Sequence, residues 1–383
     1  MPVTHSHIWP RRGRASGARS KAFVGPFIRA IGSALALGAL LLALLPTAAS
    51  ASSFNPQVGA NIGNCSVYGW NAGSKKSVVL TWKDSDGNLK NKQTVKSDSS
   101  GNFDGNCDYS ERIEFGDTIQ VTIGSGTRTL TIPKLTIAVD RVSNTVSGKG
   151  PAGDSVDVTG CERDMGCNDY TALTDGTTGA YSHDFSSDVD ITGAGYGYVD
   201  WLSPQGDDVE NSADAQSIQI WEGRPGSNLS FRASGAAGQQ FTLHLLDGSL
   251  TPIGSSAVSF DQWGTYQNDI VDADGVRVRA QAGDTVDASG LASDAYFVLP
   301  AISVSGNVKT DKVTGTCLPN LPFSFDAYAF DYSREASFDG TTNGSGSFSI
   351  KIAPQMKLKH GDHIDIYCTL STGDQVAKHI TVP

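Results

Sequence analysis

The chain has 383 residues and carries 40 acidic against 29 basic residues, a formal net charge of −11. Its first 53 residues contain six of the basic residues and no acidic one, so the remainder holds 23 basic and 40 acidic residues, a net charge of −17. Nucleic acids and anionic membranes attract basic surfaces, so this balance excludes both as expected partners.

The N-terminal stretch has the pattern of an export signal. Basic residues between Arg11 and Arg29 precede an apolar run of 15 residues, Ile31 to Leu45, and small residues follow up to an Ala-Ser-Ala triplet at 49–51. This pattern predicts a secretory signal peptide over residues 1–51, with an uncleaved anchor as the alternative. The run is shorter than the roughly 20 residues that cross a bilayer, so we expect no membrane insertion after cleavage. The chain is predicted to be secreted and extracellular, either released or associated with the cell surface.

A short cassette recurs four times along the rest of the chain. Each copy has a polar loop that begins with Asp or Asn, then a glycine, one further residue and an aromatic. Glycine supplies the positive φ of a tight loop, and the Asp or Asn side chain bonds its own backbone there. The aromatics are Phe103, Tyr181, Tyr266 and Phe348, spaced by 78, 85 and 82 residues. A repeat of fixed period predicts tandem structural units.

The unit boundaries follow from a second mark. An apolar residue plus proline stands at Ile132-Pro133, Leu299-Pro300 and Val382-Pro383, and proline ends a strand because it cannot donate to a ladder. We therefore predict four modules after the signal peptide, over residues 52–133, 134–216, 217–300 and 301–383. No Gly/Ser-rich or Pro-rich linker separates them, so short and stiff joints are expected.

Within the modules the hydrophobic period is two residues. Short runs rich in β-branched residues, such as 118–123 and 363–366, alternate between Gly/Asp/Ser clusters. This pattern predicts an all-β fold of antiparallel β-sandwiches. A Gly-Asp-x-(Val/Ile) element occurs at Gly116, Gly153, Gly283 and Gly361, where it predicts a turn followed by the start of a strand.

The cassette and the Gly-Asp element together resemble bacterial immunoglobulin-like and carboxypeptidase-regulatory-like tandem β-sandwich repeat proteins. In those families a D-x-x-G-x-(Tyr/Phe) turn and a G-D-x-(Val/Ile) turn frame successive strands. The resemblance covers nearly all of the chain after the signal. It implies four immunoglobulin-like modules with a spacer, adhesion or ligand-binding role and no catalytic residue.

Six cysteines follow the signal peptide, and an even number in an exported chain predicts disulfides. Three of the predicted modules hold two cysteines each and the third holds none, so pairing within modules is the economical arrangement. Zinc is the competing interpretation, but no cysteine or histidine spacing fits a zinc site. The predicted bridges are Cys65–Cys107, Cys161–Cys167 and Cys317–Cys368.

Few residues suggest chemistry. The Asp84–Asn88 and Asp272–Gly275 segments resemble fragments of calcium loops, although hairpin turns explain both, and calcium at module junctions is the alternative. The pair His360 and His363 is compatible with metal binding but also with a solvated loop. No nucleophile elbow or catalytic constellation is present, so we expect no enzyme and no cofactor. Trp263 stands in a cassette loop, where it is predicted to be exposed and available for ligand contact.

The sequence therefore predicts a secreted, non-enzymatic repeat protein with a role in cell-surface adhesion, matrix structure or spacing. Its expected partners are cell-surface or matrix proteins, or glycans. The alternative is an extracellular carbohydrate-binding protein that uses exposed loop aromatics such as Trp263.

Overall fold

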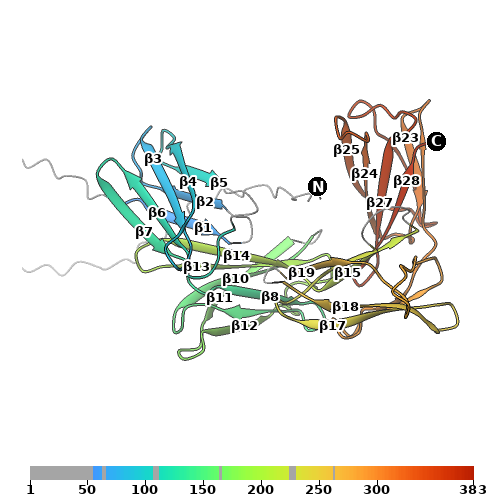
Figure 1. Ribbon diagram of the computed structural model, residues 1–383, viewed down its shortest axis with the longest axis horizontal. Helices are drawn as coiled ribbons and strands as arrows, with labels where there is room; N and C mark the ends of the chain where they lie inside the picture. Colours follow the sequence, from blue (N-terminus) through green and yellow to red (C-terminus); the bar gives the residue numbers. More distant parts are fainter. Residues whose placement is uncertain (1–54, 63–65, 107–111, 164–165, 224–229, 262–263) are drawn as a thin grey trace, which may run out of the picture. The chain divides into compact units, whose positions relative to one another are not determined.

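The computed structural model describes residues 55–62, 66–106, 112–163, 166–223, 230–261 and 264–383 (Figure 1). Every regular element among them is a β-strand, so the fold class is all-β. None of the described residues forms a helix long and apolar enough to cross a membrane. Residues 54–383 belong to one compact unit, and the predicted signal peptide lies outside the described residues.

Among the described residues, seven strands fall in each of the four predicted segments. The first contains β1 (Gln57–Asn61), β2 (Ser66–Trp70), β3 (Ser77–Lys83), β4 (Leu89–Lys96), β5 (Phe103–Asn106), β6 (Thr118–Ile123) and β7 (Gly126–Thr131). The second contains β8 (Thr136–Asp140), β9 (Thr145–Lys149), β10 (Ser155–Glu162), β11 (Gly166–Leu173), β12 (Ala180–Asp184), β13 (Tyr196–Leu202) and β14 (Asp208–Asp214). The third contains β15 (Ser217–Glu222), β16 (Phe231–Ser234), β17 (Gln240–Leu246), β18 (Pro252–Ser259), β19 (Thr265–Asn268), β20 (Thr285–Asp287) and β21 (Tyr296–Val298). The fourth contains β22 (Ser303–Asn307), β23 (Lys312–Thr316), β24 (Pro322–Tyr328), β25 (Glu335–Thr341), β26 (Ser347–Lys351), β27 (His363–Thr369) and β28 (Gln375–Thr381).

Each segment repeats one strand arrangement. Its first, second and fifth strands form one antiparallel set, and its fourth, third, sixth and seventh strands form the other, as β1-β2-β5 and β4-β3-β6-β7 do in the first segment. Two sheets that face each other across a core form a β-sandwich, so the chain is a tandem array of sandwiches. The segment limits themselves remain a prediction, because the described chain is a single compact unit.

Two sheets extend across the predicted joints, which the sequence did not indicate. The first strand of segment one, β1, pairs in parallel with the last strand of segment two, β14, so both belong to one seven-stranded sheet. In the same way β15 pairs in parallel with β28, and strands of segments three and four share a second seven-stranded sheet. Figure 1 shows the first of these junctions where the labels β1 and β14 lie next to each other. Two of the three joints, between segments one and two and between segments three and four, are therefore hydrogen-bonded strand pairs as well as short connections.

The hydrophobic core divides in the same way. One cluster of buried residues runs from Val58 to Ala215 and includes the indole ring of Trp82. The other runs from Ile218 to Val382 and includes several phenylalanines, of which Phe325 is fully buried. The alternating strand patterns supply one inward face to each sheet, which is the period-two burial that the sequence predicts.

The cassette aromatics occupy equivalent positions, as the repeat predicts. Each lies in the fifth strand of its segment and faces a small residue of the second strand. Phe103, Tyr181 and Phe348 are buried, whereas Tyr266 is half-buried and packs on Phe231. The register pairs are Phe103–Gly69, Tyr181–Gly148, Tyr266–Ala233 and Phe348–Gly315.

The glycine opposite the aromatic makes room for the ring. A Cβ atom on Gly315 would collide with the ring of Phe348 and with the carbonyl of Ser303. We expect Gly315→Ala to lower the free energy of unfolding by about 1–3 kcal/mol, because overpacking forces the ring or the strand to move. Thermal unfolding measures the loss, and Gly344→Ala is the control, since a Cβ there has no backbone neighbour within 4 Å. Equal stability of the two variants would contradict this packing.

The cassette turns have the conformation that the sequence predicts: the glycine has positive φ, and the Asp or Asn that begins the turn accepts its amide hydrogen bonds. Gly101, Gly179, Gly264 and Gly346 all have positive φ, between 69° and 86°. The Asp98 carboxylate accepts hydrogen bonds from the amides of Asn102 and Ser100, and these bonds hold its pKa below the ordinary aspartate value. The amides of Thr178 and Thr177 lower the pKa of Asp175 in the same way. These aspartates therefore stabilise turns.

Candidate functional site

The outer face of the sheet in segment four carries a chain of hydrogen-bonded polar side chains. Asp365, on β27, is only 6% exposed. The Tyr328 hydroxyl donates to its Oδ2 at 3.0 Å, and Nδ1 of His379 donates to its Oδ1 at 2.6 Å. When His379 is neutral, its Nε2 accepts from Nδ1 of His363 at 3.2 Å. One buried carboxylate therefore orients a phenol and two imidazoles.

Strand periodicity explains why these residues meet. Ile364 and Ile366 of β27 point into the core, so His363 and Asp365 must point outward. The antiparallel register then sets Asp365 opposite His379 of β28 and opposite Asp326 of β24. Residues from three strands thus converge on one face.

A loop after β24 adds aromatic rings beside this network. The Tyr332 ring stacks on Tyr328, with centroids 5.1 Å apart and planes at 7°. The Phe330 ring lies 5.8 Å from that of His363 and is 82% exposed. We call the six residues of this surface the aromatic–histidine face: Tyr328, Phe330, Tyr332, His363, Asp365 and His379.

The loop is held in an unusual backbone conformation. Tyr332 has a φ of +54°, a left-handed value that bulky residues rarely adopt. Its amide donates to the carbonyl of Ala329 at 2.9 Å, and the amide of Ala329 donates to the carbonyl of Arg334. Hydrogen bonds from Ser333 to the Asp331 carboxylate tighten the same turn and lower the pKa of Asp331. The turn thus fixes Tyr332 on Tyr328 and leaves Phe330 in solvent.

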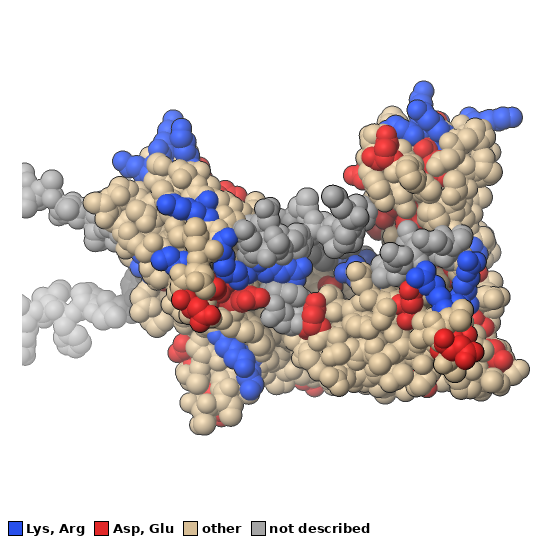
Figure 2. Space-filling model, in the orientation of Figure 1, with Lys and Arg blue, Asp and Glu red and all other residues tan. Residues whose placement is uncertain are grey.

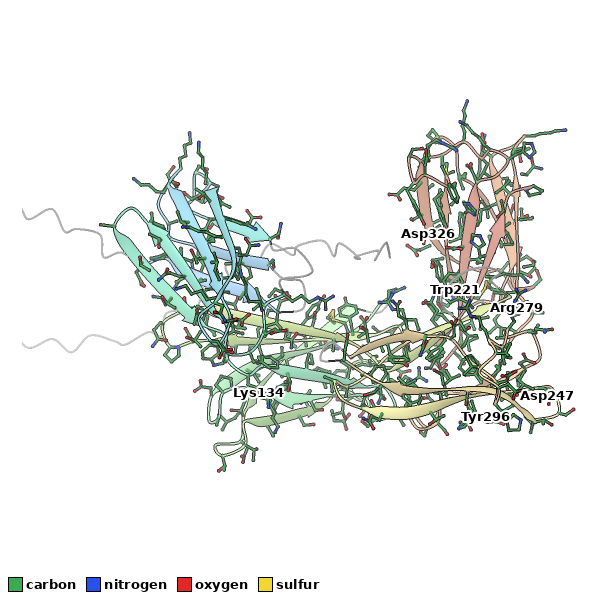
Figure 3. All side chains as sticks on the ribbon, in the orientation of Figure 1. Lys134, Trp221, Asp247, Arg279, Tyr296 and Asp326 are labelled. Atoms are coloured by element: carbon green, nitrogen blue, oxygen red, sulfur yellow. A yellow bond between two sulfur atoms is a disulfide. The ribbon has the colours of Figure 1, made fainter. Side chains whose placement is uncertain are left out.

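The same sheet face continues onto the neighbouring segment. Trp221 of β15 lies in the row of Ala377 and Tyr367, and its ring meets Tyr367 edge-on at 5.4 Å. Figure 3 labels Trp221 on β15 and Asp326 on β24, two strands of this sheet. Trp221 is 9% exposed, so it supports the face and offers little contact area of its own.

Three of the other tryptophans have packing or hydrogen-bonding roles within the fold. Trp82 is core, Trp70 stacks on Tyr68, and Trp201 donates its indole N–H to Asp154 at 3.0 Å. Trp263 lies outside the described residues, so its predicted ligand contact stays a prediction.

Two cysteine pairs are joined in the structure. Cys161 and Cys167 face each other across the β10–β11 hairpin, with Cα atoms 4.1 Å apart. Cys317 follows β23 and Cys368 lies in β27, so this bridge connects the two sheets of a sandwich, with Cα atoms 5.6 Å apart. Cys65 and Cys107 lie outside the described residues, and their pairing stays a prediction.

The structure separates the histidine pair noted in the sequence. The ring of His360 contacts the carbonyl of Pro383, whereas His363 contacts His379. No group of three His, Cys, Asp or Glu side chains suited to a metal ion occurs among the described residues. Asp84 and Asp272 accept amide hydrogen bonds from their own hairpin turns, as predicted. The sequence analysis did not identify His379. The signal that could have found it is its position in β28, the strand that follows β27 and pairs with it.

A second group of buried charges lies at the module junctions and was also missed. Asp207 is 5% exposed and binds Arg128 with both carboxylate oxygens, at 2.9 and 2.6 Å. Asp374 is fully buried and binds Arg141 in the same bidentate way, at 2.9 and 2.8 Å. Burial alone would lower the pKa of the Arg141 guanidinium, but its bonds and charge attraction to Asp374 and Asp294 raise it. Both aspartates stand in Gly-Asp-x-Val elements, at Gly206 and Gly373, so a search for further copies of this motif in the sequence would have found them.

The strand arrangement defines a tandem β-sandwich repeat protein. Acidic and basic side chains are interspersed on the face drawn in Figure 2. No protein-family model matches the chain, and no curated protein matches it.

Several solved structures are similar to this chain at low identity. A tetra-tandem repeat from the extending region of a large adhesion protein is 14% identical and has a TM-score of 0.17, covering 86% of this chain and 99% of its own. A 1.5-MDa bacterial ice-binding adhesin is 11% identical, with coverages of 86% and 96% and a TM-score of 0.15. The chicken CNTN1 FN1–FN3 domains are 9% identical, with coverages of 85% and 99% and a TM-score of 0.18. The strand pairing described above defines the fold.

Proposed function

We propose that this chain is a non-enzymatic, adhesion-type protein of the cell exterior whose sandwiches present the aromatic–histidine face to a surface partner. The observation that carries this proposal is the exposed ring of Phe330, 82% exposed beside a buried polar network. A phenylalanine left in water forgoes roughly 1.5–3 kcal/mol of burial free energy. The strained turn at Tyr332 holds the ring there instead of letting it fold back onto the sheet.

The composition of the face fits a binding role. Aromatic rings surrounded by hydrogen-bonding groups are typical of contact centres in protein interfaces. Tyr328 and Asp365 are already bonded to each other, so the polar part of the face is ordered before a partner arrives.

A binding assay on the producer's own envelope tests the proposal. The full chain without residues 1–51 is compared with Phe330→Ser and with Tyr332→Gly, which keeps the left-handed turn but removes the ring. We expect each variant to lose about tenfold or more in affinity, as truncation of an interface anchor does. Leu173→Ser is the matched control, because Leu173 is 73% exposed on β11, in another segment. Unchanged binding by both variants of the face would reject the proposal.

A carbohydrate-binding role is the second candidate. The ring of Tyr332, which is 49% exposed and stacks on the buried Tyr328, offers a flat apolar surface, and the adjacent His363 offers a hydrogen-bonding group. Sugar rings suit such a combination, because they have apolar faces and hydroxyl edges. Binding of the chain to a glycan array, lost in Tyr332→Gly, would favour this role, whereas binding to protease-sensitive envelope material would favour a protein partner.

A further inference from the structure

The two parallel strand junctions share one design. The first joins β1 to β14, with Gly59 opposite Asp208 and Asn61 opposite Glu210. The second joins β15 to β28, with Gln219 opposite Gln375 and Glu222 opposite Lys378. In each case the first strand of one segment lies beside the last strand of the next segment, so each junction closes a pair of sandwiches.

Each junction is capped by the same buried carboxylate. The amide of Val58 donates to Asp207 Oδ1 at 3.0 Å, between residues 149 apart in sequence. The amide of Ile218 donates to Asp374 Oδ1 at 2.7 Å, between residues 156 apart. Both aspartates follow a glycine with positive φ in the turn before the last strand, and both bind an arginine. Charge-assisted, bidentate contacts of this kind are among the strongest hydrogen bonds in proteins.

The direction of the paired strands has a mechanical consequence. When the chain is pulled from its two ends, force enters β1 at its N-terminal end and leaves β14 at its C-terminal end. Because the strands are parallel, they are pulled in opposite directions along their own axes. All the hydrogen bonds of the junction then share the load in shear, whereas a strand peeled from one end loses them one at a time.

We propose that both junctions are force-bearing clamps that carry tension across each pair of sandwiches. Since β14 ends at Asp214 and β15 begins at Ser217, the load passes almost directly from the first clamp to the second. The strands between the clamped residues lie outside the load path until a clamp breaks. The first clamp shares no strand with the aromatic–histidine face, so a test on β1 and β14 is independent of the proposed binding role.

Single-molecule force spectroscopy on the full chain without residues 1–51 tests the first clamp. Azide-bearing residues replace Asn55 and Asp214 in one chain, so that the tether loads the junction in shear. They replace Asn55 and Gln205 in the matched control chain, so that the tether peels the same junction from its N-terminal end. Asn55, Asp214 and Gln205 are exposed, and both chains share the change at Asn55, which removes one hydrogen bond from Arg128.

At one loading rate, we expect the rupture force of the shear tether to exceed that of the peel tether by about twofold or more, because forced separation follows the barrier along the pulling direction. Equal forces in the two geometries would overturn the clamp. It would also be overturned if a sandwich in the shear-tethered chain unfolded, with its full gain in length, before the junction opened.

Discussion

Replacing Arg141 by methionine is expected to lower the free energy of opening at the β15–β28 junction by about 3–5 kcal/mol, because it leaves a buried carboxylate without its counter-charge. The side chains of Arg141 and Asp374 are 1% and 0% exposed, and the pair is bidentate. Asp374 also accepts a hydrogen bond from the amide of Ile218 on β15, so loss of its arginine partner weakens the contact that holds this strand in the junction. Hydrogen exchange at the Ile218 amide of the full chain measures the effect.

Two further variants separate charge from packing. Arg141→Met combined with Asp374→Asn removes both charges and keeps an acceptor for Ile218, so it is expected to recover most of the loss. Arg277→Met removes a salt bridge to Asp269 whose arginine is 40% exposed, and exposed pairs contribute about 0–1 kcal/mol. If Arg141→Met costs no more than Arg277→Met, the buried pair does not hold the junction.

Removing the disulfide between Cys317 and Cys368 by alanine substitution is expected to cost about 4 kcal/mol of unfolding free energy, because the bridge closes a loop of 51 residues in the unfolded chain. Both residues are buried, at 8% and 0% exposure, so alanine fills the sites without exposing a new polar group. Hydrogen exchange at the amides of β23 and β27, measured in the full chain at increasing denaturant concentration, gives the loss in unfolding free energy.

The second disulfide provides the comparison. Cys161 and Cys167 are six residues apart, so the same loop-entropy relation gives about 2 kcal/mol for their removal. The two double-alanine variants should therefore differ by roughly a factor of two in cost. Equal costs would show that the contacts of the sulfur atoms, and not loop closure, determine the stabilisation.

The local parts of the fold were predictable because their causes are local. A tight turn needs a glycine with positive φ and a side chain that accepts the turn amides, and Asp98 and Gly101 supply both only three positions apart in sequence. The period of two along β27 likewise predicts which residues face the core. The equivalence of the four cassette aromatics followed from their spacing alone.

The candidate site was less visible in the sequence. His360 and His363 suggest a metal site because they are close in sequence, yet across the glycine turn they contact different partners, Pro383 and His379. The relevant partner, His379, lies 16 residues later and meets His363 only through the pairing of β27 with β28. Phe330 had no sequence signal, since its exposure depends on the left-handed turn at Tyr332.

The sequence by itself determined the all-β class, the turns and the repeated cassette, because these depend on residues within a few positions of each other. Only the tertiary structure decided that sandwiches pair through β1 with β14 and β15 with β28. Those contacts join residues about 150 positions apart, and any of several free strand edges satisfies the same local pattern. At both junctions complementary buried groups meet, Asp207 with Arg128 and Asp374 with Arg141, and no local pattern encodes their meeting.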